Sequence, residues 1–244
     1  GLANGKTYTA RARTRDLALP FNERLIDAAF LFDNAEPTAS AAVPANGSFK
    51  NSNFTLSGGS SDPDPDGGGP LAASLVSTVS VSIQKLGTAT CYAYGLGFTA
   101  GCPNYIPAFG APATWTFLPS PNPYVNSGKY MVLAQAIDNA GKTQSAFAPG
   151  VSSNVFTYAD VTPDSRVVFP NTVTRSAVAD INGTAASAGQ LSPLQGVVVS
   201  IGQVVGPATS YWDGGGYNSG TEIFVPTAFV GYTSGTWSLA TTPL

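Results

Sequence analysis

Apolar and polar residues alternate along several short stretches of this chain with a period of two. Val76–Lys85 reads Val-Ser-Thr-Val-Ser-Val-Ser-Ile-Gln-Lys. Lys129–Ile137 alternates in the same way, with Tyr130, Val132 and Ala134 on one face. Clusters of Gly, Pro, Asn and Asp separate these stretches, and a helical period is nearly absent. Such a pattern indicates strands that each bury one face, so the chain is predicted to be all-β and built from sandwiches.

Two motifs recur at one spacing and reveal an internal repeat. Thr114-Trp115-Thr116-Phe117 returns as Thr236-Trp237-Ser238-Leu239, and Asn4-Gly5-Lys6-Thr7-Tyr8 returns as Asn126-Ser127-Gly128-Lys129-Tyr130. The shift from Trp115 to Trp237 equals the shift from Tyr8 to Tyr130, and it is half of the 244-residue length. A fixed period is typical of tandem arrays. We expect two periods of a longer array, cut out of phase with its own domains.

The repeat sets the expected strands. In the central domain these are Ser40–Val43, Phe54–Ser57, Val76–Lys85, Cys91–Phe98, Asn104–Ile106, Thr114–Leu118, Lys129–Ile137 and Asn154–Tyr158. In the following segment they are Arg166–Phe169, Val178–Ile181, Val197–Ile201, Ser210–Trp212, Ile223–Val225 and Thr236–Leu239. That segment lacks two final strands, and their equivalents are Thr7–Arg15 and Ala28–Phe32.

The expected domains follow from this comparison. Residues 1–33 are the closing hairpin of a preceding sandwich, 34–159 a complete sandwich, and 160–244 a sandwich without its last two strands. Such a truncated sandwich would expose an unpaired edge and core side chains such as Trp237, which is unfavourable. We expect an adjacent copy to supply the missing strands by strand addition. A fold-back within the chain would have to pass a whole intervening domain.

The order of the motifs resembles that of a known class. A Val-x-Val-Ser-Ile strand, the aromatic loop Tyr211–Tyr217, Thr-Trp-Ser/Thr, Asn-Gly-Lys-Thr-Tyr and an Asp-Asn-Ala-Gly turn follow one another. This order is similar to that of the tandem bacterial Ig-like repeats of long cell-surface and adhesin-type proteins. The resemblance implies tandem Ig-like sandwiches, one complete and two partial, with an extracellular structural or adhesive role. It names no ligand.

Composition narrows the classes of function. Only 10% of the residues are charged, the net charge is −3 and no histidine is present. The chain therefore lacks the charge of a nucleic-acid-binding protein and the commonest general base and metal ligand. It contains no Gly-x-Ser-x-Gly elbow and no phosphate loop, and no apolar run approaches the roughly 18 residues of a membrane span. We expect a protein that is not an enzyme.

The two cysteines are expected to form a disulfide. Cys91 and Cys102 align with Ser210 and Thr221, so both differ from the sister repeat together. In a histidine-free, extracellular chain, a disulfide is favoured over a metal site.

An acidic stretch is the candidate cation site. Asp62-Pro63-Asp64-Pro65-Asp66-Gly67 matches the first half of a calcium loop, but Ala73 stands where a bidentate Glu would belong. Asp62, Asp64 and Asp66 could bind Ca²⁺ weakly, and a solvated turn is the alternative. Asp16, Asp33 and Asp138 lie at strand ends, where the resemblance to Ig-like arrays implies a place for interdomain Ca²⁺; Asp is equally a turn former there. No other cofactor is expected.

The aromatic loop is the candidate ligand site. Tyr211, Trp212 and Tyr217 could stack on a sugar ring, although Tyr92 and Phe98 occupy the positions of Tyr211 and Tyr217 in the other repeat, which favours packing.

The predicted partners are copies of the chain itself. The residues expected at the assembly interface are Thr7, Tyr8, Ala10, Ala12, Met131, Leu133 and Ile137. The last three form an apolar stripe, and their counterparts on the first strand include Arg11 and Arg15, which form a basic ladder with Arg13. We expect a stalk, fibre or sheath. The alternative is an adhesin or carbohydrate-binding module that uses the aromatic loop.

Overall fold

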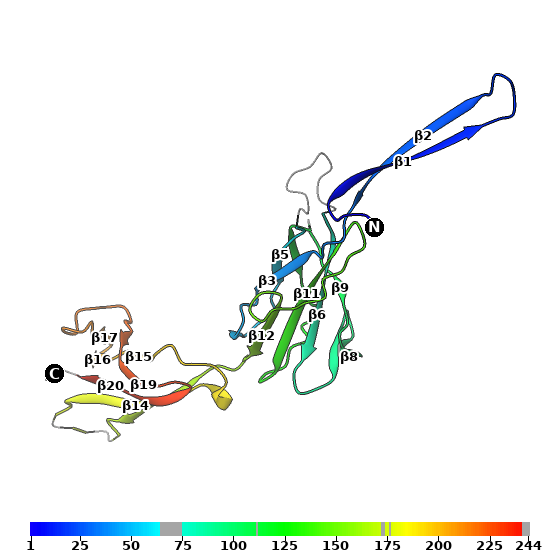
Figure 1. The fold of residues 1–244 in the computed structure, drawn as a ribbon. Coiled ribbons are helices and arrows are strands. Elements are labelled where there is room, and N and C mark those ends of the chain that lie inside the picture. The colour runs from blue at the N-terminus through cyan, green and yellow to red at the C-terminus, as the bar shows by residue number, and fades with distance from the viewer. Residues whose placement is uncertain (64–74, 111, 172–173, 176, 241–244) are drawn as a thin grey trace. The chain divides into compact units, whose positions relative to one another are not determined.

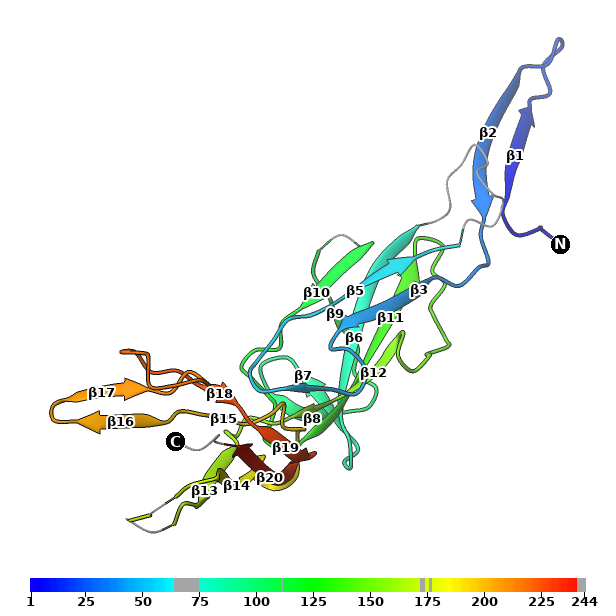
Figure 2. The ribbon, with the colours of Figure 1, turned by 90° about the vertical axis from the view of Figure 1, so that its left-hand side faces the viewer.

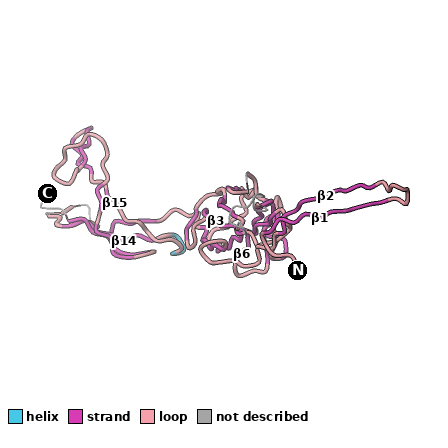
Figure 3. Tube along the Cα trace, turned by 45° about the horizontal axis from the view of Figure 1, so that its top comes forward, coloured by secondary structure: helices cyan, strands magenta, loops and turns pink. Residues whose placement is uncertain are grey.

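The computed structural model describes residues 1–63, 75–110, 112–171, 174–175 and 177–240. The chain divides into two compact units, Gly1–Tyr158 and Ala159–Leu244, called unit 1 and unit 2 here. In the described residues, all regular secondary structure is strand except one short 3-10 segment, η1 (Ala188–Gln190), as Figure 3 shows. The all-β prediction is confirmed.

Unit 1 begins with a hairpin of two antiparallel strands, β1 (Lys6–Arg15) and β2 (Glu23–Phe32), which form a sheet of their own (Figure 1). The pairing runs over the whole length, from Lys6 opposite Phe32 to Arg15 opposite Glu23. The second strand is therefore five residues longer at its start than the sequence pattern of Ala28–Phe32 suggests.

The rest of unit 1 consists of two sheets that face each other across one core (Figures 1 and 2). One sheet has the order β10-β5-β3, and the other has the order β4-β12-β11-β6-β7-β8, with β9 also paired to β6. Their bounds are β3 (Thr38–Val43), β4 (Ser48–Lys50), β5 (Leu56–Ser61), β6 (Val76–Lys85), β7 (Thr90–Ala93), β8 (Gly97–Gly101), β9 (Ile106–Pro107), β10 (Thr114–Phe117), β11 (Lys129–Asp138) and β12 (Ser153–Tyr158).

The alternating pattern positions the core of unit 1. Along β11, Tyr130, Val132 and Ala134 are completely buried, whereas Met131 and Leu133 are half-exposed. Side chains of a strand point alternately to its two faces, so the tyrosine face of β11 packs inward. The core residues opposite it come from the three-stranded sheet and include Leu56 and Trp115.

Unit 2 holds a four-stranded sheet of order β13-β14-β20-β19 and two pairs, β15-β18 and β16-β17. Their bounds are β13 (Asp164–Phe169), β14 (Asp180–Ala186), β15 (Val198–Val199), β16 (Gly202–Val205), β17 (Ala208–Tyr211), β18 (Val225–Pro226), β19 (Ala228–Gly231) and β20 (Ser234–Ala240).

Strands β13, β14 and β20 repeat β3, β5 and β10 in detail. Trp115 of β10 lies opposite Gly58 of β5, and Trp237 of β20 lies opposite Gly183 of β14. In each case the indole N–H donates a 3.2 Å hydrogen bond to the carbonyl of the residue after that glycine. Both first strands also shift register near their ends, between Ala41/Val43 and Val167/Phe169. The repeat is therefore structural as well as sequential.

The expected single strand Cys91–Phe98 is wrong. Cys91–Phe98 is not continuous but divides into β7 and β8, which pair as a hairpin. Gly95 in the intervening turn and Gly97, the first residue of β8, adopt φ values of +75° and +72°, a conformation that glycine reaches without steric cost.

Candidate assembly interface

The hairpin β1–β2 reproduces the geometry of β11–β12. Tyr8 lies opposite Phe30 in the hairpin, as Tyr130 lies opposite Phe156 in the sandwich. The ring centroids of Tyr8 and Phe30 are 5.8 Å apart with planes inclined by 28°. For Tyr130 and Phe156 the values are 5.4 Å and 27°. The two strand pairs therefore share register and ring packing.

Equivalent loops donate a hydrogen bond to the hydroxyl groups of both tyrosines. The Ala3 N–H donates a hydrogen bond of 2.7 Å to the hydroxyl of Tyr8, and the Val125 N–H donates one of 2.8 Å to the hydroxyl of Tyr130. Burial raises the pKa of Tyr130, so its hydroxyl stays protonated. Each tyrosine hydroxyl thus binds the backbone N–H of the residue five positions earlier. This contact holds the preceding loop against the beginning of the strand, as in a tyrosine corner.

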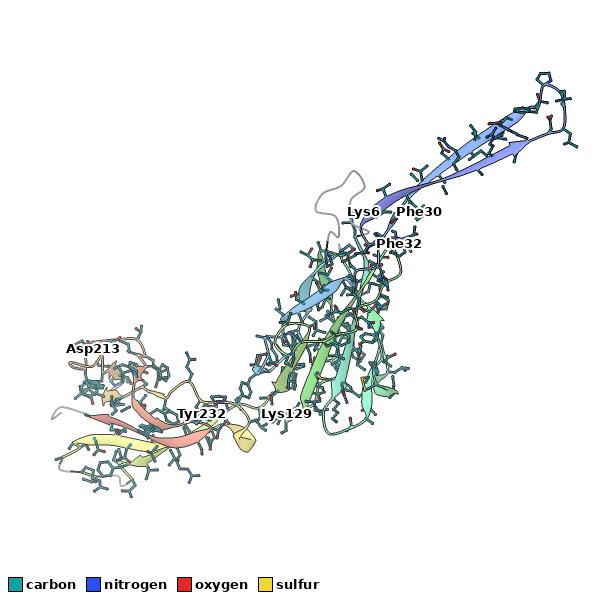
Figure 4. All side chains as sticks on the ribbon, in the orientation of Figure 1. Lys6, Phe30, Phe32, Lys129, Asp213 and Tyr232 are labelled. Atoms are coloured by element: carbon teal, nitrogen blue, oxygen red, sulfur yellow. A yellow bond between two sulfur atoms is a disulfide. The ribbon has the colours of Figure 1, made fainter. Side chains whose placement is uncertain are left out.

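The two strand pairs differ in what covers them. Among the described residues of unit 1, six of the sixteen buried core residues come from β11 and β12: Tyr130, Val132, Ala134, Ala136, Phe156 and Tyr158. The shared register makes Tyr8, Ala10, Ala12, Thr14, Phe30 and Phe32 their counterparts, called the inner face of the hairpin here. These counterparts are exposed or half-buried, and Phe30 is 42% exposed. Figure 4 labels Phe30 and Phe32 near the end of the hairpin where the sandwich begins.

The opposite face of the hairpin is charged and internally paired. Arg11 forms a bidentate contact with Asp27, at 2.7 and 2.8 Å, which lowers the pKa of that carboxyl group. Arg13 and Arg15 both contact Glu23. The three arginines and Asp27 are 45% to 63% exposed and Glu23 is 25% exposed, so the ion pairs contribute little stability. The basic ladder therefore meets acidic groups within its own hairpin.

In unit 2, the successive strands β15 and β16 take the place of β6 of unit 1. They pair on one side with β18 and β17, as β6 pairs on one side with β9 and β7. Val199 of β15 lies opposite Val225, as Val81 of β6 lies opposite Ile106. Gln203 of β16 lies opposite Ser210. This pairing repeats that of Gln84 with Cys91.

The other side of β15 and β16 is an open edge. Strand β6 pairs on that side with β11 over nearly its whole length. In the described part of unit 2, no strand pairs with β15 or β16 there. The edge therefore presents unsatisfied backbone donors and acceptors to another strand.

The apolar core of unit 2 is small. Its fully buried apolar cluster contains Ile181, Ala185 and Trp237, with Val199 and Ile201 among the half-buried residues against it. Val204 and Val205 of β16 are 72% and 67% exposed. Unit 2 thus has apolar side chains in place but lacks the partners that β11 and β12 give to unit 1.

The expected exposure of Trp237 is wrong. Its side chain is 3% exposed, because the indole lies against the bare backbone of Gly183 and beneath the half-buried residues of the cluster. The incompleteness of unit 2 therefore appears along β15 and β16 rather than at Trp237.

The sequence-predicted interface residues lie in two separate places. Thr7, Tyr8, Ala10 and Ala12 belong to the hairpin, whereas Met131, Leu133 and Ile137 form the half-exposed outer face of β11. Phe30 and Phe32, on the β2 side of the inner face, were not among the predicted residues, although alignment of Phe30 with Phe156 identifies them.

The predicted disulfide is present. Cys91 of β7 and Cys102, one residue beyond β8, are bonded, and they close the β7–β8 hairpin. Cys91 is buried beside Ser82 of β6.

The calcium-loop prediction lies mostly outside the described residues, which include Asp62 but not Asp64 or Asp66.

The aromatic loop is packed and organised by an aspartate. Trp212 is only 5% exposed, while Tyr211 and Tyr217 are half-buried. A buried indole offers no open face to a sugar ring. Asp213 accepts hydrogen bonds from the side chain of Asn218 and from the N–H groups of Gly215 and Gly216, which lower the pKa of its carboxyl group.

Comparison of the chain with protein-family models, curated proteins and solved structures gives no significant match. Among the described residues, no helix has the length and apolarity needed to cross a bilayer.

Proposed function

We propose that this protein is a structural, non-catalytic component of an extracellular stalk, fibre or sheath, built from tandem Ig-like sandwiches. In this proposal, the hairpin β1–β2 of one copy completes unit 2 of the adjacent copy. The hairpin would take the place beside β15 and β16 that β11 and β12 take beside β6.

A single observation carries the proposal: the hairpin has the register, ring stack and tyrosine corner of β11–β12, but in the described part of the chain the residues of its inner face are exposed or only half-buried. In unit 1, the counterpart of this hairpin, β11–β12, is buried with β11 paired to β6. The hairpin therefore has the conformation needed to pair with an edge equivalent to that of β6. The open edge of β15 and β16 in the same chain is the matching acceptor.

The energetics favour insertion. Burying a phenylalanine side chain that was exposed contributes about 1.5–3 kcal/mol, and the inner face offers Phe30, Phe32 and Tyr8. Strand addition also pairs the backbone groups of the open edge. The Arg ladder would remain on the outer face, where its ion pairs with Asp27 and Glu23 need not break.

The extracellular setting is supported by the disulfide between Cys91 and Cys102, because such bonds persist in oxidising compartments. A chain with only 10% charged residues also suits a crowded assembly rather than a dilute enzyme. The burial of Trp212 supports packing of the aromatic loop over the alternative role in carbohydrate binding.

The test is assembly of full-length variants, followed by light scattering and electron microscopy. Ala12→Arg places a charge on the inner face at the counterpart of Ala134, which is completely buried. We expect the unchanged chain to form fibres and this variant to remain monomeric. Thr9→Arg alters the outer face of the same strand and serves as the matched control, with fibre formation retained. Equal assembly of Ala12→Arg and the unchanged chain would refute the proposal.

A further inference from the structure

We propose that Asp33, Asp62 and Asp138 form a calcium site at the junction between the hairpin and the sandwich of unit 1. The three residues come from distant parts of the sequence. Asp33 directly follows β2, Asp62 directly follows β5, and Asp138 is the last residue of β11. One carboxylate oxygen from each lies within 4.8 Å of the others.

Two of these carboxylates are buried, and each has one oxygen atom without a hydrogen-bond partner. Asp138 is 2% exposed and Asp33 is 8% exposed. The Oδ1 atom of Asp138 accepts a hydrogen bond from the Lys142 N–H, and Oδ1 of Asp33 accepts one from the Ala35 N–H. The Oδ2 atoms of both residues are buried without a hydrogen-bond partner. Unsatisfied buried carboxylate oxygens are unfavourable, and their convergence with a third carboxylate points to a cation.

Among the described residues, no ion pair joins a positive side chain to Asp33 or Asp138; the arginines Arg11, Arg13 and Arg15 pair instead with Asp27 and Glu23. Carboxylate oxygens alone are ligands for hard cations, and flexible coordination with backbone carbonyls and water is typical of Ca²⁺.

The local structure holds each aspartate in place. Asp138 starts a tight turn in which its own N–H and carbonyl pair with Lys142 and Gly141, and Gly141 adopts φ +85°. Its Oδ1 bond to Lys142 then fixes the carboxylate, so that Oδ2 is free to bind an ion. Asp33 is held in the same way by Ala35.

An ion here would link three elements of unit 1. Because Asp33 is the first residue after β2, the ion would tie the base of the hairpin to the ends of β5 and β11. The site belongs to unit 1 alone and does not depend on the proposed assembly. The sister repeat has Ser187 in the place of Asp62, one residue beyond β14, so we assign no site to unit 2.

Calorimetric titration of the chelator-treated full chain with CaCl2 tests the proposal, together with thermal unfolding with and without Ca²⁺. We expect one site per chain and a rise in the melting temperature. Asp138→Asn and Asp33→Asn keep an oxygen for the backbone bond but remove the charge, and each should weaken Ca²⁺ binding at least tenfold. Asp213→Asn, in a turn of unit 2 whose carboxylate is fully hydrogen-bonded, is the matched control and should bind as the unchanged chain does.

Other outcomes would overturn the site. Absence of Ca²⁺ binding by the unchanged chain would refute the proposed site. Binding that survives Asp33→Asn and Asp138→Asn but is lost in Asp64→Asn would place the ion in the loop Asp62–Gly67. Neither result bears on fibre formation, which the Ala12→Arg variant tests separately.

Discussion

The indole of Trp115 lies directly over Gly58, the residue opposite it across β5 and β10. A Cβ at Gly58 would lie 2.7 Å from Cζ2 of Trp115 and would overlap the backbone carbonyl of Ser40. Trp237 and Gly183 repeat this arrangement, with the corresponding distance 2.5 Å. The glycine on the neighbouring strand is therefore what allows the tryptophan of each repeat to be buried.

Gly58→Ala should lower the free energy of unfolding of unit 1 by about 1–3 kcal/mol, because overpacking a dense core forces the neighbours to shift. Chemical denaturation measures the change. Gly101→Ala in β8 is the control, since a Cβ there would meet nothing within 4 Å. A loss in Gly58→Ala no larger than that in Gly101→Ala would contradict the packing argument.

The repeat and the strand order could be predicted from sequence because their signals are local. The period-two alternation of Val76–Lys85 gives the strand that the structure shows, with the same bounds. Trp115 and Trp237 mark equivalent positions because a large buried ring tolerates few replacements, and their shared glycine contacts confirm the alignment. Such alternation can be recognised in a short stretch of sequence, without knowing which distant residues are in contact.

Other features depend on contacts that no local pattern records. The burial of Trp237 rests on Gly183 and on half-buried residues such as Phe229. The approach of Asp33 and Asp138 to Asp62 arises only when the ends of β2, β5 and β11 meet. The split of Cys91–Phe98 into two strands is different, because Gly95 and Gly97 within this segment are a local sequence signal for a turn.

Cysteine pairs should trap the proposed insertion in one register. In unit 1, Ala134 lies opposite Val81, and the equivalent pair is Ala12 of the hairpin with Val199 of β15. A mixture of Ala12→Cys chains and Val199→Cys chains should form disulfide-linked dimers under mild oxidation, visible on a non-reducing gel. Arg13→Cys is the control, because its side chain points to the opposite face and should not cross-link.

The same reagents separate insertion between copies from fold-back within one chain. A double variant that carries both Ala12→Cys and Val199→Cys should give ladders of linked chains. Compact oxidised monomers at every protein concentration would mean that the hairpin fills unit 2 of its own chain, and the fibre proposal would fail.

The disulfide should stabilise unit 1 alone. Cys91 and Cys102 are 11 residues apart in sequence, and closing a loop of this size contributes about 2–3 kcal/mol in the chain-entropy model. The double variant Cys91→Ser/Cys102→Ser should therefore unfold at lower denaturant concentration than the oxidised chain. Reduction of the unchanged chain with a thiol should produce the same shift, and a thiol should leave the double variant unaffected.

The outer face of β11 is the predicted lateral contact between domains or subunits. Met131, Leu133 and Ile137 are half-exposed there, whereas the hairpin carries Arg11 and its neighbours at the equivalent positions. Leu133→Lys should weaken the association of fibres or domains while leaving the melting temperature of the monomer nearly unchanged. Gln135→Lys, on the same face, controls for the added charge. Assembly of Leu133→Lys that matches the control would count against this contact.

Acid should loosen the aromatic loop before it unfolds the sheets. Hydrogen bonds from Asn218 and from the N–H groups of Gly215 and Gly216 lower the pKa of Asp213, so they stabilise the ionised carboxylate. A lowered folded-state pKa means that this stability is present above the ordinary Asp value of about 3.9 and is lost as the pH falls through the lower value. The emission of the adjacent buried Trp212 should therefore change with a midpoint below about pH 3.9, and this step should be absent in Asp213→Asn. A midpoint at or above that pH, with the step still present in the variant, would show that another group controls the loop.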